Sequence, residues 1–240
     1  MTSTTVEEGL GRIGVGRAQV ATLLATGLTW SGDASELAVM AYLVPVLQDE
    51  WGMAQAAADT IASVLFAGML AGAFGWGLLS DLYGRRFTWR VTTTLTAVGG
   101  VLSAAAPHRG VSIFLMSRAL VGVGLAGTNL AFALACEFLP QRARGRVLVL
   151  FELFFTFGSV FEVGMAWLVL PACGWRVLLL LTTLPLWIAL ALSVVVPESP
   201  RLDVVRGHPQ RALKTLQAMA RSNGKPPFQC SAVLAIASDG

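Results

Sequence analysis

Six long apolar stretches constrain this 240-residue chain more than any other feature of its sequence. Each is near or above the length of about 20 residues that a helix needs to cross a bilayer. None shows the two-residue alternation of an outer-membrane barrel strand. We therefore expect an all-α membrane protein built as a six-transmembrane-helix bundle. The stretches run over residues 18–47, 60–79, 88–106, 111–135, 147–170 and 177–196.

The composition excludes several other classes of protein. Hydrophobic residues make up 55% of the chain and charged residues only 13%, whereas a soluble domain has about 25% charged residues. An ordinary soluble enzyme is therefore excluded, and no nucleophile–base arrangement argues for catalysis. The basic residues are scattered between apolar stretches, so nucleic acid is not an expected partner. We expect no metal site and no cofactor, because the histidines and cysteines lack the spacing of ligands.

The basic residues also predict an orientation. If both ends of the chain lie in the cytoplasm, 14 of the 17 lysines and arginines fall in cytoplasmic segments, and only Arg109 and Arg176 fall in outer loops. We expect an N-in, C-in, multi-pass protein of the plasma membrane or of an intracellular vesicle.

The sequence divides into four parts. Residues 1–17 form a cytoplasmic N-terminal segment, residues 18–196 the bundle, residues 197–228 a second cytoplasmic segment, and residues 229–240 a tail without a clear pattern. An amphipathic helix is expected between Gly207 and Asn223, because Leu213, Leu216 and Met219 share one face. This helix either lies on the membrane surface or docks at a specific place.

Two glycine patterns within the apolar stretches are interpreted as packing features. Gly122, Gly124 and Gly127 satisfy G-x-G-x-x-G, but no strand precedes them, which excludes a dinucleotide site. Gly68 and Gly72 satisfy G-x-x-x-G. Small residues let helices approach closely, so we expect both patterns at helix contacts within the bundle.

The strongest local signal is the run from Gly75 to Arg86, at the predicted cytoplasmic end of the second span. An acid there can pair with arginines of the same turn, and glycines allow a sharp turn and close approach to a neighbouring helix. Such a cluster can lock two helices together and release them when they move. Its members are Gly77, Asp81, Gly84, Arg85 and Arg86.

These residues resemble the G-x-L-x-D-x-x-G-R-R/K signature of the major facilitator superfamily. Three further segments resemble motifs of the same family in the expected order: Arg118 to Gly124, Glu137 with Arg144 and Gly145, and the run Pro197-Glu198-Ser199-Pro200-Arg201. Within the family, the chain is most similar to the synaptic vesicle protein related branch, which lies beside organic ion transporters.

The resemblance implies a fold and a mechanism. Members of the family have two halves of six spans each, which rock around a site at the membrane midplane. The chain resembles the N-terminal half. By the same resemblance, the cluster around Asp81 and the loop with Glu137, Arg144 and Gly145 act as cytoplasmic latches, together with Glu198 and Arg201.

Charged residues inside the spans are the candidate site. Asp33 and Glu36 are three residues apart, which places them about 60° apart on one helix face. Buried charges are costly in a membrane and tend to face a cavity or a partner. We expect Asp33, Glu36, Arg118 and Glu162 to line the central cavity as proton-coupling or cation-binding groups. The alternative is that they form fixed ion pairs for packing.

Three functional hypotheses remain open. The chain is part of a transporter that moves a small organic solute by alternating access, as a proton- or cation-coupled symporter, with a C-terminal half missing here. It is a half-size protein completed by a second copy. Or it is a non-transporting regulator or binding partner of a full transporter. The expected partners are the bilayer, the solute, protons, and the missing half or second copy.

Overall fold

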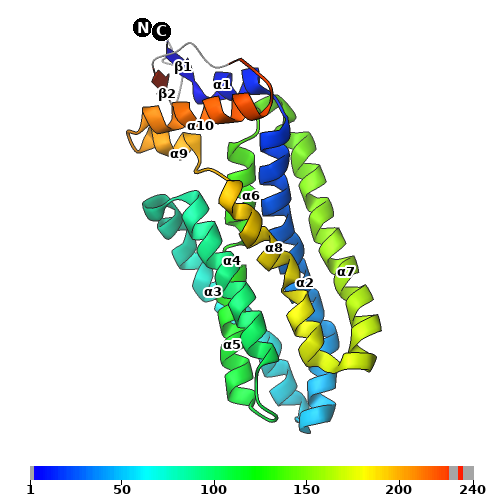
Figure 1. Cartoon of the computed structure of the whole chain (residues 1–240). Coiled ribbons are helices and arrows are strands. Elements are labelled where there is room, and N and C mark those ends of the chain that lie inside the picture. Colours follow the sequence, from blue (N-terminus) through cyan, green and yellow to red (C-terminus); the bar gives the residue numbers. More distant parts are fainter. Residues whose placement is uncertain (1–2, 227–231, 235–240) are drawn as a thin grey trace.

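The computed structural model describes residues 3–226 and 232–234, which are almost entirely helical. Seven helices form an elongated bundle, and the smaller elements gather at one end beside both termini (Figure 1). The bundle helices are α2 (Arg17–Trp51), α3 (Gln55–Tyr83), α4 (Arg85–Ala104), α5 (Val111–Leu125), α6 (Thr128–Glu137), α7 (Gln141–Thr182) and α8 (Leu184–Leu192). The smaller elements are β1 (Ser3–Thr5), α1 (Val6–Ile13), the 3-10 turn η1 (Ser193–Val195), α9 (Pro200–Val205), α10 (Pro209–Ser222) and β2 (Ala232–Leu234).

Glycines with positive φ mark three of the places where the chain reverses. Gly52 (φ 63°) ends α2, and Gly84 (φ 114°) separates α3 from α4. Gly174 (φ 78°) breaks the helical geometry inside α7, and the chain turns back there toward α8 (Figure 1). Residues with a Cβ are disfavoured in this region of backbone space, so glycine is the expected residue at each turn.

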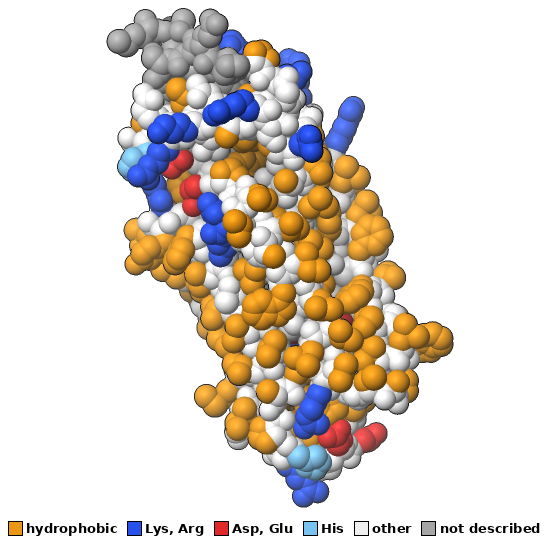
Figure 2. Space-filling view, viewed as in Figure 1, with side chains coloured by type: hydrophobic (Ala, Val, Ile, Leu, Met, Phe, Trp, Pro, Cys, Tyr) orange, Lys and Arg blue, Asp and Glu red, His pale blue; other side chains and the backbone are white. Residues whose placement is uncertain are grey.

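Three segments of the described residues are long and apolar enough, by length and composition, to cross a membrane. They are Gln55–Tyr83, Val111–Glu137 and Gln141–Val195. The sequence predicts six spans. Two of them are not counted because their helices carry polar residues: α2 has Asp33 and Glu36 near its middle, and α4 is rich in threonine. The predicted spans 147–170 and 177–196 count as one because they fall in the single segment Gln141–Val195. Apolar side chains nevertheless cover the middle of the molecule, with charged residues at its two ends (Figure 2).

The glycine patterns lie at close helix contacts: Gly68, Gly72 and Gly122 lie between α3 and α5, whereas Gly124 and Gly127 face Thr92 and Thr96 of α4. A Cβ on Gly68 would lie 2.3 Å from the carbonyl oxygen of Ala119, and one on Gly122 would lie 2.0 Å from that of Leu65. Gly72 similarly faces the carbonyl of Val123, at 2.6 Å. Any side chain would separate the two backbones, so the expected packing role of these glycines is confirmed.

Two apolar cores stabilise opposite ends of the bundle. At the end far from the termini, Trp51 packs edge-on against Phe114 and Trp175, with ring centroids 5.7 Å from each. At the other end, Leu10 and Trp89 belong to a core that also includes residues of α6 and α10. The cores hold the bundle helices at both ends of the buried polar residues described below.

The amphipathic segment forms α10, which docks on α1. Its residues Leu213, Leu216 and Met219 are buried in the same core as Leu10 and Ile13 of α1. Of the two placements open from the sequence, the structure therefore favours a specific docking site. The tail contains β2, which pairs in parallel with β1; the rest of the tail, including Cys230, lies outside the described residues.

We predict that Gly68→Ala destabilises the bundle by about 1–3 kcal/mol, the usual cost of inserting atoms into a packed interface. The matched control is Gly75→Ala on the same helix, where a Cβ would meet no described atom within 4 Å. The measurement is the unfolding free energy of each variant in detergent. Equal stability of the two variants would contradict the assigned contact between α3 and α5.

Candidate functional site

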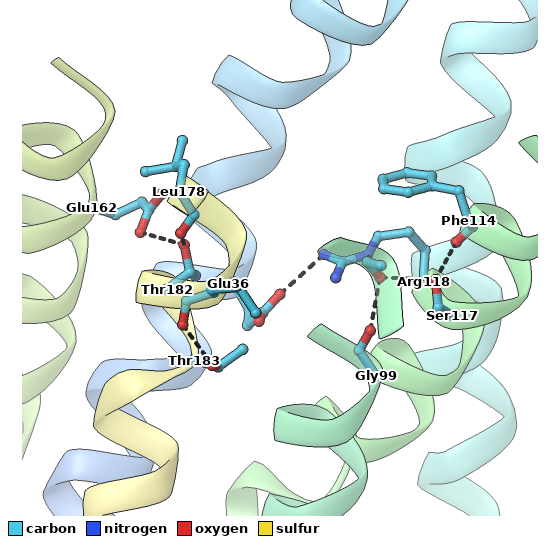
Figure 3. Close-up of polar contacts among 11 residues, drawn as sticks. Glu36, Gly99, Phe114, Ser117, Arg118, Glu162, Leu178, Thr182 and Thr183 are labelled. Atoms are coloured by element: carbon cyan, nitrogen blue, oxygen red, sulfur yellow. Dashed lines mark hydrogen bonds and ion pairs between the residues drawn. The ribbon is translucent and has the colours of Figure 1, made fainter. Parts of the chain in front are cut away.

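A fully buried ion pair lies at the centre of the bundle. The Nη1 atom of Arg118 on α5 is 3.0 Å from the Oε2 atom of Glu36 on α2, and both side chains are 0% exposed. Arg118 also donates from Nε to the hydroxyl of Ser103, at 2.8 Å, and its guanidinium lies 5.6 Å from the ring centroid of Phe114 (Figure 3). The sequence leaves open a fixed ion pair among the buried charges, and the structure shows one between Arg118 and Glu36.

Asp33 lies on the same helix but has a different partner. Its Oδ2 atom accepts a hydrogen bond of 2.7 Å from the hydroxyl of Thr128, the first residue of α6. Among the described residues no arginine, lysine or histidine forms an ion pair with Asp33. Asp33 borders a hollow of about 490 Å³ in the side of the bundle, whereas Glu36, Arg118 and Glu162 do not border it. The two acids that share a helix face therefore have separate environments.

Glu162 of α7 is the third buried carboxylate. Its Oε2 atom accepts a hydrogen bond of 3.0 Å from the hydroxyl of Thr182, and Oε1 has no partner in the described structure. Figure 3 shows Glu162 and Glu36 on opposite sides of the helical segment that carries Thr182 and Thr183. Because this helical segment separates Glu162 from Glu36, Arg118 pairs with Glu36 and not with Glu162.

The buried groups do not balance in charge. Three carboxylates, Asp33, Glu36 and Glu162, lie within the bundle beside the single guanidinium of Arg118. An uncompensated charge is expensive at membrane depth. The cluster is therefore suited to gain protons or a cationic ligand, which would remove the excess negative charge.

A second network lies at the end of the bundle that carries the termini. Arg85 is 3.1 Å from Asp81 and 3.4 Å from Glu137, so it joins the turn between α3 and α4 to the end of α6. Glu198 accepts a hydrogen bond of 3.0 Å from the backbone N–H of Arg86. A Cβ on Gly84 would lie 2.6 Å from Glu198, so glycine is needed here for space as well as for its positive φ.

The other predicted latch residues have separate surroundings in the structure. Arg144 lies in the first turn of α7, on the side facing α1, and its partner is Glu7 at 3.7 Å and not Glu137. Gly77 and Gly145 lie on exposed helix faces, where a Cβ would meet no described atom within 4 Å. The prediction that Gly77 permits close approach of a neighbouring helix is therefore wrong within the described structure.

Glu7 is a central residue of this network that the sequence does not single out as a site. Its carboxylate also contacts Arg201 at 2.5 Å and accepts a hydrogen bond of 2.8 Å from the backbone N–H of Gln141. The latter contact caps the start of α7, where Pro140 offers no side-chain cap. An acid in a polar N-terminal segment gives no signal for partners 134 and 194 residues away.

The acid Asp203 of α9 lies close to the same network. Burial, followed by the nearby negative charge of Glu198, raises the pKa of its carboxyl, while Arg211 acts in the opposite direction. At the other end of the bundle, Glu50 accepts a hydrogen bond of 2.7 Å from Trp175 and lies 3.6 Å from Arg176. Both ends of the molecule thus carry charged contacts that tie separate helices together.

Comparison with known proteins places the chain in a family. The family described as "Sugar (and other) transporter" matches residues 26–230. The chain belongs to this family. Its relatives are transporters rather than enzymes, and the chain is a multi-pass integral membrane protein.

Relatives within the sugar transporter family include proteins of animals and plants. The chain is 38% identical over 219 residues to "Putative transporter svop-1" of Caenorhabditis elegans, covering 91% of this chain and 42% of that protein. It is 40% identical to "Synaptic vesicle 2-related protein" of Rattus norvegicus (92% and 40% covered). It is 38% identical to "Organic cation/carnitine transporter 7" of Arabidopsis thaliana (92% and 44% covered). The chain thus spans about two-fifths of the length of these relatives.

Solved structures show the fold of this family member. The chain resembles the proton:xylose symporter XylE, a major facilitator superfamily protein, with a TM-score of 0.73 and 23% identity, covering 86% of this chain and 50% of that one. A partially occluded inward-open conformation of XylE from E. coli gives the same TM-score and covers 54% of that chain. The expected major facilitator fold is confirmed, and the motifs correspond to its N-terminal half.

We predict that Arg118→Gln costs about 3–5 kcal/mol of stability, because it leaves the carboxylate of Glu36 buried without its partner. The double variant Glu36→Gln/Arg118→Gln should lose much less than the sum of the two single losses. Unfolding in detergent measures both, with Arg142→Gln on the exposed surface as the control. Additive losses would show that the two side chains do not interact.

We predict that Glu7→Gln loosens the start of α7 by about 1 kcal/mol, a usual size for a partly exposed ion pair. The readout is hydrogen exchange at the amide of Gln141, which should become about fivefold faster. Glu8→Gln is the control, because the carboxylate of Glu8 contacts only Thr4 and Thr5 through hydrogen bonds. If both variants leave the exchange unchanged, Glu7 does not cap α7.

Proposed function

We propose that this protein is the N-terminal half of an alternating-access transporter that moves a small organic solute, coupled to protons or another cation. The observation that carries the proposal is the buried cluster of three carboxylates and one guanidinium, in a member of a transporter family. A purely structural cluster would gain little from the two excess acids, because unpaired charges destabilise a membrane bundle.

The proposal includes six spans with both ends in the cytoplasm. Six helical passes support it: α2, α3, α4, α5 with α6, α7 up to Gly174, and the rest of α7 with α8. Lysines and arginines gather near the end that carries both termini, as the rule for cytoplasmic loops requires (Figures 1 and 2). Polar residues in α2 and α4 face neighbouring helices, which is compatible with membrane insertion.

The hydroxyl contacts of the buried acids support proton binding. The hydroxyl of Thr128 contacts both Asp33 and the backbone carbonyl of Leu125. The hydroxyl of Thr182 likewise contacts Glu162, at 3.0 Å, and the carbonyl of Leu178, at 2.9 Å. A threonine has one hydroxyl proton to donate. If each acid carries a proton, the acid donates to the hydroxyl while the hydroxyl donates to the carbonyl, and every contact is satisfied.

The cytoplasmic network fits the role of a latch. Arg85 joins the turn after α3 to α6, and Glu198 joins the start of α4 to the segment before α9. These contacts are partly exposed and individually weak, so a movement of the helices can break them at small cost. Their loss would shift the balance between inward-open and outward-open states.

A second six-span unit completes the transporter in this proposal. The hollow beside Asp33 opens on the side of the bundle, and the chain spans two-fifths of its relatives' length. We propose that a C-terminal half covers this side, with a second copy of the chain as the alternative. Crosslinking in native membranes, followed by mass determination, separates the two.

We predict that Asp33→Asn and Glu162→Gln uncouple transport from the proton gradient. Uptake of solute by proteoliposomes that hold the protein in its native oligomeric state is measured with and without an imposed pH gradient. The variants should lose most of the stimulation by the gradient, because neither amide can bind and release a proton. Asp49→Asn, which removes an exposed carboxylate from the same helix α2, is the control. Unchanged stimulation in both variants would refute coupling through these acids.

A further inference from the structure

The hollow beside Asp33 has the size and position of a small-molecule site. Its volume of about 490 Å³ falls within the range of about 300–1,000 Å³ typical of ligand pockets. Four parts of the bundle border it: α2, α3, the junction of α5 with α6, and α7. Most of its lining is apolar, and the polar side chains among the lining residues are those of Asp33, Thr128 and Asn129, with the indole of Trp30.

Among the described residues that line the hollow, Asp33 is the only charged one. Its side chain is nearly inaccessible (3% exposed), yet it borders the open space. The buried guanidinium of Arg118 is not available to neutralise it, because Arg118 is held by Glu36 and Ser103. The hollow is therefore an anionic site without a cation of its own in the described part of the chain.

Aromatic rings line the same hollow as this carboxylate. Trp30 lies one helical turn before Asp33 on α2, and its ring centroid is 5.7 Å from that of Phe155 on α7. The rings of Phe151 and Phe132 also lie near the indole, with centroid distances of 5.7 and 6.4 Å. The Nε1 atom of Trp30 is buried and has no acceptor in the described structure. A buried indole N–H usually has a partner, so this donor is a second, independent sign of a missing ligand.

We propose that this hollow binds an organic cation, an amine or quaternary ammonium, with Asp33 as its counter-ion and Trp30 and Phe155 against its apolar part. The inference rests on the proposed transport function and names its substrate class. A carboxylate removes the cost of burying the cation, and aromatic faces attract it further. A hydrogen-bond acceptor on the ligand would meet the free N–H of Trp30.

The same lining argues against a sugar as the ligand. A sugar presents a hydroxyl on nearly every carbon, and each buried hydroxyl needs a hydrogen-bond partner. The hollow offers few polar side chains, and the hydroxyl of Thr128 already contacts Asp33 and Leu125. A largely apolar cation has only one or two polar groups, so the few polar side chains of the hollow suffice as its hydrogen-bond partners.

The first test compares a cation with its uncharged isostere on the unmodified protein. Radiolabelled benzyltrimethylammonium is bound at equilibrium to the purified protein in lipid nanodiscs. Choline and 3,3-dimethyl-1-butanol, which has the same shape without the charge, then compete with it. We expect choline to displace the probe at a concentration at least about tenfold lower than the concentration of 3,3-dimethyl-1-butanol that is needed. Equal displacement by the two competitors, stronger displacement by xylose, or no saturable binding of the probe would overturn the proposal.

The second test locates the site with matched variants. Asp33→Asn should weaken binding of benzyltrimethylammonium about tenfold or more, and Trp30→Leu about threefold to tenfold. Asp49→Asn, the same substitution at the exposed end of α2, should leave the affinity within about twofold. Thermal midpoints of all variants show which of them are folded, and only folded variants are compared. Equal affinities for Asp33→Asn and Asp49→Asn would place the cation elsewhere.

The two proposals can fail separately. If choline competes as expected but proteoliposomes move no solute, the transport function fails and the cation site stands. If the protein transports a neutral solute, and choline neither competes with the probe nor is transported, the proposed substrate class is wrong and the proposed transport function holds. Uptake of labelled choline that is lost in Asp33→Asn and kept in Asp49→Asn would support both.

Discussion

The ion pair between Glu36 and Arg118 is the constraint on which the interior of this protein depends. It joins α2 to α5 at the centre of the bundle, with both side chains fully removed from solvent. A buried pair of this kind adds little net stability, but the loss of either partner is very costly. Because Glu36 holds the only guanidinium of the cluster, Asp33 and Glu162 are left to hydroxyl partners. The excess of buried acids over buried bases, on which the proposed coupling rests, follows from this single pairing.

Small residues place the helices close enough for these contacts to form. Gly122 and Gly68 bring α3 and α5 together, and Gly100 on α4 leaves room for the carboxylate of Glu36, since a Cβ there would lie 2.6 Å from Oε1. Tight packing fixes the position of α5, and therefore of Arg118, relative to α2. At the end of the bundle that carries the termini, partly exposed ion pairs join the helices instead. The central contacts are fully buried, whereas those at the end that carries the termini are partly exposed and individually weak.

The sequence predicts the family motifs and the local turns well, because both depend on local spacing. It correctly indicates the turn at Gly84, the pairing of Asp81 with Arg85, and the packing role of Gly68 and Gly122. It does not predict the partners of residues far apart in the chain. Glu137 and Arg144 belong to one predicted loop motif, but Glu137 contacts Arg85 and Arg144 contacts Glu7.

By itself, the sequence determined the class of this protein: the length and polarity of its segments permit only a helical membrane protein, and four ordered motifs fix the family. Tertiary structure decided which charges meet. Asp33 and Glu36 share a helix face, yet one borders a hollow lined by aromatic rings and the other is sealed against Arg118. The separation depends on where α5, α6 and α7 pack around α2. Such packing is a property of the whole bundle, because each buried charge takes its environment from helices distant in sequence.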